Sequence, residues 1–541
     1  MRTSNKAVSL LAGAALIGGA FAAIGVASPP DSPILSNVPA ANTRSDGYAP
    51  ASVLSPELYQ TVVAQGATRL ENPSALTSYY GYDNDVLNAA GQPQMIPTPA
   101  SPSTEAHKTE PDKNTFLTFK NGVPGADGSY DYGTDFLFQG HEGGANGAGY
   151  ITRINLDADA AHRVTLIADK DVDGHPLATL DGSTWDPWAK RLLFTTESAS
   201  APTYAATLDV PAKVTDVSGA LGRGGYEGIQ NDADGNIWIV EDIGGSAKPG
   251  TTAKLPNSFV YRYVPASPGD LENGKLQALQ VLNGSGDPIT QATQTALNSP
   301  DQVALHTYGN TFQTRWVTVH DTAVDGTAPF NANTAAKAKS ATPFKRPENG
   351  LFKPGSGFSE FYFDETGDTN ATSAENANAG GWGSVMKLIQ HDPSASTGTL
   401  TMFYKSDQAH SGFDNLAFLS RNVVTFVEDA GDTLHGQRNA LDSGYTLNTE
   451  SDYSKPANQP GRWLAEGRDA SATLDAANGG FGKNDGDNEI TGVHVSDGDP
   501  SSGGILGAKV PDLNNSQWRW FYTQQHGDNP TYEVFLRGHA G

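Results

Sequence analysis

The chain has 541 residues and a formal net charge of −25, with 60 glycines, 33 prolines and no cysteine. The negative charge argues against nucleic acid or an anionic membrane surface as a partner, because both would repel it. The lack of cysteine excludes disulfides, thiolate metal ligands and a thiol nucleophile. Short apolar segments bounded by Gly, Asp, Asn and Pro recur, whereas helical periodicity is scarce, so the sequence predicts an all-β protein.

The N-terminal segment is predicted to be an export signal. Arg2 and Lys6 precede an apolar run rich in Leu, Ala and Gly, and small residues at 26–28 offer a cleavage site. A membrane anchor is the alternative, because the run approaches spanning length, but its weak hydrophobicity favours cleavage. We therefore expect residues 1–27 to be removed from a secreted or periplasmic protein that has no stable membrane insertion afterwards.

Two further regions follow the signal. Residues 28–112 are predicted to form an N-terminal extension that includes a Pro/Ser/Thr-rich loop over residues 96–113. From residue 113 to residue 541 the signal for β-strands is nearly continuous and no second break in composition occurs. We therefore expect one large β domain over residues 113–541.

Acidic residues recur at both ends of short strand pairs. Six apolar segments run into Glu, Asp or His, usually followed by Gly, at residues 135–144, 191–198, 236–245, 360–368, 423–432 and 519–528. An acid beside a small residue opens a strand at Asp181, Glu227, Glu348, Asp414 and Glu489. The first four opening acids lie 16, 14, 17 and 14 residues before a closing acid. Two antiparallel strands take about that length, so both acids are expected at one edge of a sheet.

Six such units predict a six-bladed β-propeller, although their spacing is irregular. The innermost strands of a propeller surround one channel, so the acids would converge at its mouth. Crowded carboxylates cannot all stay ionised unless cations neutralise them or some bind protons. Turn formation explains Asp and Asn in this pattern but not the recurring Glu. The sequence therefore predicts a metal site at the mouth.

With these residues in place, the chain resembles the PhoX-type alkaline phosphatases. The likeness is carried, in chain order, by "GHEGG", "LDGSTWDPWAKRLLFTTE", "ALGRGGYEG", Glu241-Asp242, "KRPENG" and "NEITG" with "QQHGD". The Arg-Pro-Glu of "KRPENG" is the most specific of these matches. The resemblance implies an exported six-bladed propeller with a mixed iron–calcium cluster. The family's iron-binding cysteine falls on Asp181 here, so calcium is expected, while iron or another divalent or trivalent metal stays open.

The resemblance implies a secreted, metal-dependent phosphatase that acts on phosphomonoesters, with phosphodiesters as a second class of substrate. The expected metal ligands are Glu142, Asp181, Glu197, Glu227, Asp242, Glu348 and Glu489. Arg346 would clamp a phosphate oxygen, because its planar fork suits an oxyanion. The alternative for Arg346 is an ion pair with Glu348 or with a neighbouring blade. His526 is expected to be a proton donor or a metal ligand.

Two other functions stay open on the sequence. A calcium-dependent lactonase or ester hydrolase would use one central cation, with Asp414-Asn415 more important than Arg346. A non-catalytic propeller would keep structural calcium and bind a partner.

A separate segment, "DKDVDG" at residues 169–174, is either a surface calcium turn or a hairpin turn. It is not an EF-hand, because Leu180 stands at the twelfth position.

Overall fold

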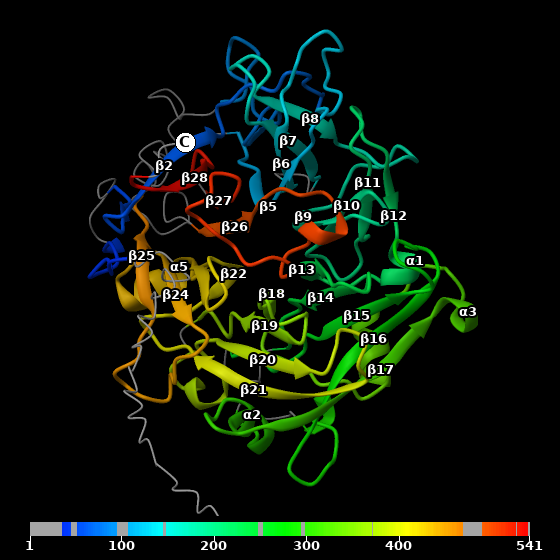
Figure 1. The fold of residues 1–541 in the computed structure, drawn as a ribbon, viewed down its shortest axis with the longest axis vertical. Helices are drawn as coiled ribbons and strands as arrows, with labels where there is room; N and C mark the ends of the chain where they lie inside the picture. Colours follow the sequence, from blue (N-terminus) through cyan, green and yellow to red (C-terminus); the bar gives the residue numbers. More distant parts are fainter. Residues whose placement is uncertain are drawn as a thin grey trace, which may run out of the picture.

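The computed structural model describes residues 35–44, 51–94, 106–143, 148–246, 253–293, 298–370, 372–468, 489–525 and 527–538. Antiparallel sheets are arranged around a central axis in a propeller-like manner (Figure 1). Helices are few and short: α1 Ser218–Leu221, α2 Pro300–Leu305, α3 Thr322–Asp325, α4 Ala332–Ala338, α5 Gly431–Arg438, η2 Gln291–Thr293, η3 Ala377–Ala379 and η4 Ser502–Gly504. The predicted all-β class is confirmed, whereas residues 1–27, the expected export signal, lie outside the described residues.

Four of the sheets have four or five strands, each wound from the axis outwards. The strands of the first two sheets are β5 Glu110–Thr118, β6 Asp135–Glu142, β7 Tyr150–Asn155 and β8 Val164–Ala168, then β9 Leu180–Asp186, β10 Arg191–Thr196, β11 Tyr204–Ala206 and β12 Val214–Asp216. Those of the last two are β22 Phe413–Phe418, β23 Val423–Glu428, β24 Ser443–Asn448 and β25 Gly461–Ala465, then β26 Ile490–Ser496, β27 Arg519–Gln524 and β28 Thr531–Leu536.

A nine-stranded sheet lies between these two pairs of sheets. Its strands are β13 Tyr226–Asn231, β14 Ile237–Glu241, β15 Val260–Pro265, β16 Gly274–Leu282, β17 Phe312–Asp321, β18 Pro347–Phe352, β19 Glu360–Glu365, β20 Ser384–Gln390 and β21 Thr397–Lys405. The outer strands β17 and β21 pair in register Phe312↔Leu400. This pairing joins two units that each begin with a strand at the axis, β13 and β18.

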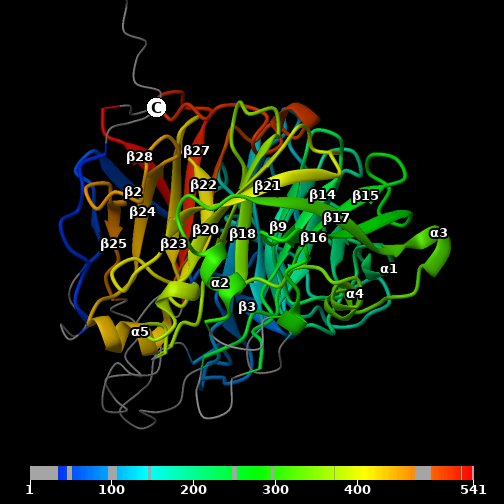
Figure 2. The same cartoon turned by 90° about the horizontal axis from the view of Figure 1, so that it is seen from below.

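Strands from the N-terminal region complete two of the C-terminal sheets. β1 (Val53–Leu54) pairs with β25, and β2 (Leu58–Ala64) pairs with β28 in register Leu58↔Leu536. Figure 2 shows these N-terminal strands beside the C-terminal ones. The remaining pair, β3 Thr77–Tyr79 and β4 Tyr82–Asp83, forms a separate two-stranded sheet. The region expected as an extension, residues 28–112, thus supplies outer strands to the β domain.

The inner strands form a closed ring around the axis. β5 contacts β9, and the contacts continue through β13, β18, β22 and β26 back to β5. The apolar cores lie between neighbouring sheets: Phe138 of β6 packs with Phe194 of β10, and Trp463 of β25 with Trp520 of β27. Apolar side chains therefore hold the sheets together, which leaves the inner strands free to line a polar channel.

The insertion between β26 and β27 closes one end of this channel. Gln230, near the end of β13, donates from Nε2 to the carbonyl of Leu506 at 3.3 Å. Trp185, near the end of β9, donates from Nε1 to the carbonyl of Pro500 at 2.8 Å. Ile505 is buried in the same core as Phe352 at the end of β18. The opposite end, where the inner strands begin, is the mouth at which the acids were expected.

Candidate metal centre

Each inner strand begins with a β-bulge of two residues. The register with the second strand shifts between Pro111 and Asn114, and likewise at the start of β9, β13, β18, β22 and β26. The first bulged residues, unit by unit, are Asp112, Asp181, Glu227, Glu348, Asp414 and Gly492. Bulges re-aim side chains. Five of the six units therefore present a carboxylate at the same place.

The second strands end in acids that face two ways, because neighbouring strand residues point to opposite sides. Three of these, Glu241, Glu365 and Glu428, are fully buried and form hydrogen bonds or ion pairs within the protein. Glu241 accepts from the backbone N of Phe259 at 3.0 Å, and Glu428 forms an ion pair with Arg438 at 2.9 Å. These three side chains stabilise the sheets and explain part of the Glu pattern without a metal.

The first bulged residues and those strand-end acids that point towards the channel meet at the mouth. Three overlapping groups each place three ligand oxygens within 4.8 Å of one another: Asp112, Glu142 and Asp181; Asp181, Glu197 and Glu227; Glu227, Asp242 and Glu348. Asp181 and Glu227 are each shared by two groups. The arrangement is a continuous row of seven carboxylates drawn from four units of the ring.

The row contains every expected metal ligand except Glu489, together with Asp112, which was not expected. Glu489 precedes β26 and belongs to none of the three groups in the described part of the chain. The position in β26 that matches the other acids is Gly492, and the role of Glu489 as a metal ligand stays a prediction. The sequence did contain an indication for Asp112: in "EPDKNTFLTF", as at Glu348, an acid follows a proline and precedes an apolar strand.

The crowding at the mouth changes the acidity of these groups. Burial, followed by neighbouring carboxylates, raises the pKa of Glu348 and Glu227 well above their usual range. Burial also raises the pKa of Asp181 strongly, and that of Asp112 to about 7. The charge of Asp429 at the end of β23 adds to the repulsion on Asp112 and Glu348. Such a site favours either bound protons or bound cations.

We expect metal-free protein to lose stability as the pH rises. A carboxyl whose pKa is higher in the folded state holds its proton there after the unfolded chain has released it, near pH 4. For Asp112 this stability is lost between about pH 4 and its folded pKa of about 7. Thermal unfolding in excess chelator should therefore give a lower Tm at about pH 7.5 than at about pH 5. Added Ca²⁺ should remove the difference, and equal Tm values in chelator would contradict this prediction.

Arg346 lies at one end of the carboxylate row. Its Nε donates to Asp242 Oδ1 at 2.8 Å, Nη2 to Asp242 Oδ2 at 2.6 Å, and Nη1 to Thr369 Oγ1 at 2.9 Å. Nη2 also lies 3.7 Å from Glu348 Oε1. The ion pairs with Glu348 and with a neighbouring unit, which the sequence left open, are thus both present. Among the described residues, these hydrogen bonds leave one N–H donor on each terminal nitrogen for a ligand.

The backbone of Arg346 is strained. Its φ is +60°, in the left-handed region that side-chain-bearing residues rarely adopt. Such a conformation costs about 1–3 kcal/mol and gathers at functional sites. Lys254 lies nearby, and the positive charge of Arg346, ahead of burial, lowers the pKa of Lys254. The sequence had not indicated Lys254, which stands in a connection between strands.

His526 lies outside the described residues, and its role stays a prediction. Its neighbour Gln525 is buried at the mouth, where Nε2 donates to Pro111 O at 3.2 Å and to Glu142 Oε1 at 3.4 Å. The end of β27 therefore reaches the carboxylate row.

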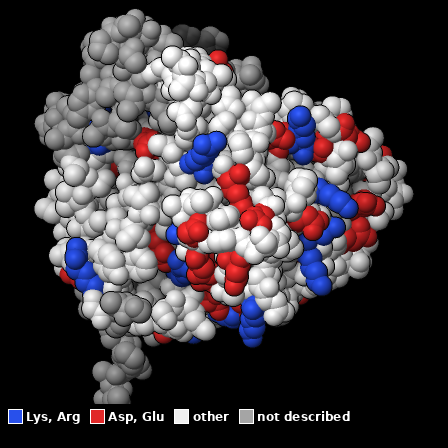
Figure 3. Space-filling view, turned by 90° about the horizontal axis from the view of Figure 1, so that it is seen from above, with Lys and Arg blue, Asp and Glu red and all other residues white. Residues whose placement is uncertain are grey.

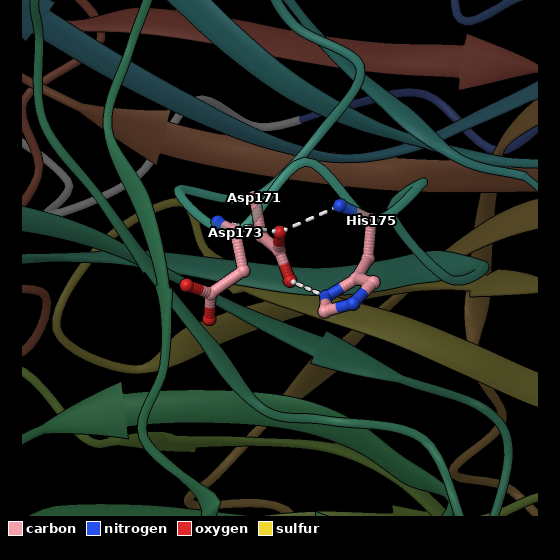
Figure 4. A group of neighbouring side chains, drawn as sticks. All are labelled: Asp171, Asp173 and His175. Carbon is pink, nitrogen blue, oxygen red and sulfur yellow. Dashed lines mark hydrogen bonds and ion pairs between the residues drawn. The ribbon is translucent and has the colours of Figure 1, made fainter.

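The "DKDVDG" segment forms a turn at the surface (Figure 4). Asp171 Oδ1 accepts from the backbone N of Asp173 at 2.9 Å and of His175 at 2.8 Å, and Oδ2 lies 3.2 Å from His175 Nδ1. The Asp171 carboxylate is thus used to cap its own loop, as in an ordinary Asx turn.

Acidic side chains also gather on the side of the molecule seen in Figure 3, in line with the net charge.

Residues 251–499 match the model of a family described as alkaline phosphatase PhoX. Over these residues the chain is similar to the PhoX family. The predicted resemblance is confirmed, and with it the prediction of a phosphatase enzyme. The matched region contains Arg346, Glu348 and Glu489, while the other expected ligands precede it. No curated protein matches the chain.

Among solved structures, PhoX from Pseudomonas fluorescens in complex with vanadate, a transition state analogue, is similar in fold. The TM-score is 0.54 at 12% sequence identity, covering 94% of this chain and 98% of that one. Sqt1 from Chaetomium thermophilum (TM-score 0.32, 12% identity, 80% and 97% covered) and a fungal alcohol oxidase of the AA5 family with copper (0.31, 10%, 79% and 76%) match more weakly. Among the described residues, no helix has the length and apolar character needed to cross a membrane.

Proposed function

We propose that the protein is an exported, metal-dependent phosphatase that hydrolyses phosphomonoesters, with phosphodiesters as a second class of substrate. The observation that carries this proposal is the row of three overlapping carboxylate groups that ends at Arg346. A row that shares Asp181 and Glu227 between groups can hold several cations side by side, next to a guanidinium that suits phosphate. This is the arrangement that phosphoryl transfer needs.

We also propose that the fold is a six-bladed propeller. The support is the ring of six inner strands, each of which opens with the same bulge against its second strand. In this assignment the nine-stranded sheet contains two blades, joined through β17 and β21. The acids at the first bulge position meet at one end of the axis, because each takes the same position in its own blade.

The residues at the mouth fit hard cations. Every donor in the row is a carboxylate oxygen, which suits Ca²⁺ and also ferric iron or another divalent or trivalent metal. Asp181, on which the cysteine of the family falls in the sequence match, is shared by two groups, and its carboxylate is proposed to take the place of the thiolate. Bound cations would supply charge stabilisation of the phosphoryl oxygens and an acidified water.

The chain's own residues would then bind and orient the ester. The planar guanidinium of Arg346, held in place by Asp242 and Thr369, offers its free N–H groups to a phosphate oxygen. Lys254 would add a second positive charge on the same side. His526, next to the buried Gln525, is proposed to hold a proton for the leaving oxygen. Export is proposed from the N-terminal sequence alone.

A calcium-dependent lactonase has less support. That function needs Asn415 as a ligand of a central cation, but Asn415 Oδ1 already accepts from the ammonium of Lys113 at 3.2 Å. A single central cation would also leave most of the carboxylate row without a counter-ion.

The decisive experiment combines metal analysis with hydrolysis assays on the purified protein. We expect more than one metal ion per chain, and hydrolysis of p-nitrophenyl phosphate that a chelator abolishes and Ca²⁺, with or without iron, restores. Bis(p-nitrophenyl) phosphate and a lactone serve as comparison substrates. Hydrolysis that is insensitive to chelation would contradict the proposal, as would one calcium per chain together with activity on the lactone alone.

A further inference from the structure

Lys113 occupies the second bulge position of β5, one layer inside the carboxylate row. The other inner strands have Gly182, Gly228, Asn349, Asn415 and Val493 at this position. The Lys113 side chain reaches the two inner strands that follow β5 around the ring: its Nζ donates to the carbonyl oxygen of Val493 in β26 and to Asn415 Oδ1 in β22, both at 3.2 Å. Lys113 is only 4% exposed. An ammonium this deeply buried requires anionic partners.

Two carboxylates whose charges act on Lys113 each have an oxygen without a partner among the described residues: Asp364 in β19, and Asp414 at the first bulge position of β22. Asp364 is fully buried, and its Oδ1 accepts from the backbone N of Asn349 at 2.8 Å. Asp414 is 8% exposed, and its Oδ1 accepts from Asn415 Nδ2 at 2.7 Å. The Oδ2 atoms of both residues are buried and have no hydrogen-bond partner among the described residues. A buried, unpaired carboxylate oxygen is costly unless the group binds a proton or a cation lies close by.

The ammonium of Lys113 is the cation that the chain itself supplies here. Burial lowers the pKa of Lys113, and the charges of Asp414, Asp112 and Asp364, in that order, oppose this effect and favour the ammonium. Asn415 joins the two sides of this layer, because its amide accepts from Lys113 and donates to Asp414. The counter-ion of these carboxylates is therefore a side chain of the protein, the ammonium of Lys113.

We propose that the Lys113 ammonium is the resident cation of an inner site that includes Asp364 and Asp414, where it takes the place of a metal ion. Because Asp414 takes the same bulge position as acids of the row, this site adjoins the proposed metal centre and limits that centre to the four units that supply the row. The inference goes beyond the proposed function and can be tested without it, because metal counts do not depend on hydrolysis of any ester.

The test compares metal content and Tm of the full-length protein with those of Lys113→Met. We expect the variant to bind one Ca²⁺ per chain more than the wild type, because the inner carboxylates lose their counter-ion. In chelator its Tm should fall below that of the wild type, and Ca²⁺ should restore it. Lys113→Arg, which keeps the charge, should have the metal content of the wild type.

A matched control removes another buried lysine. Lys345 Nζ lies 3.2 Å from Asp368 Oδ1, and that carboxylate also accepts from Asn376 at 2.8 Å. Lys345→Met leaves a single carboxylate with its own donor, so we expect no additional cation there. An unchanged metal count in Lys113→Met, with a Tm that Ca²⁺ does not restore, would overturn the proposal.

A second measurement keeps the proposal testable if Lys113→Met does not fold. Crystals of the wild type soaked in Mn²⁺ should show anomalous density along the row at the mouth and none at Asp364 and Asp414. A manganese ion bound to these two carboxylates beside an intact Lys113 would overturn the proposal.

Discussion

Replacing Arg346 by alanine is expected to lower kcat/KM for p-nitrophenyl phosphate by about 10²–10³, as removal of a preorganised donor to a developing oxyanion does. The side chain is positioned before substrate arrives, since Asp242 holds Nε and Nη2 at 2.8 and 2.6 Å and Thr369 holds Nη1 at 2.9 Å. Its strained φ of +60° fits a position kept for function. Steady-state kinetics with metal analysis of the same sample is the measurement.

Two variants show whether the loss comes from the phosphate contact. Arg346→Lys keeps the charge but loses the planar fork, so its activity should fall between those of the wild type and the alanine variant. Arg223→Ala removes an arginine that pairs with Asp216 at 2.8 Å in a half-buried surface position, and should leave kcat/KM unchanged. An Arg346→Ala enzyme with full metal content and unimpaired kinetics would exclude the phosphate clamp.

Replacing Glu227 by glutamine is expected to remove metal and activity together. Glu227 belongs to two of the three carboxylate groups and is only 7% exposed, so no other side chain can easily take its place. Removal of a residue that only orients a metal ligand lowers metal affinity by about 10–100-fold. Removal of the ligand itself should lower the affinity by at least as much. Metal affinity from competition with a chelator, and kcat/KM at saturating Ca²⁺, are the measurements.

Glu489→Gln is the informative comparison for Glu227→Gln. Glu489 was expected from the sequence as a ligand, but it stands three residues before Gly492, the position that matches Glu227 in register. If the bulge decides which acids reach the metals, Glu489→Gln should lose much less metal than Glu227→Gln. Equal losses in the two variants would show that the row extends beyond the three groups.

Local patterns in the sequence were sufficient for the fold class and for most of the candidate site. Short apolar segments ending in acid and glycine indicated antiparallel strand pairs, because strand residues alternate between two faces and turns need glycine and aspartate. The Arg-Pro-Glu at residues 346–348 indicated the family in the region that the family model matches. These signals are local, so the sequence carried them without help from the tertiary structure.

Only the tertiary structure decided which acid of each pair faces the channel. A bulge adds one residue to a strand and so reverses the side on which the following residues lie. For this reason the first bulged residue of five inner strands presents a carboxylate at the mouth, whereas β26 has Gly492 at that position. At the end of β14 the alternation of strand residues separates the two acids, so that Asp242 reaches the mouth while Glu241 is buried in the sheet. The contact between Lys113 and Asn415, 302 residues apart, likewise exists only because the ring closes.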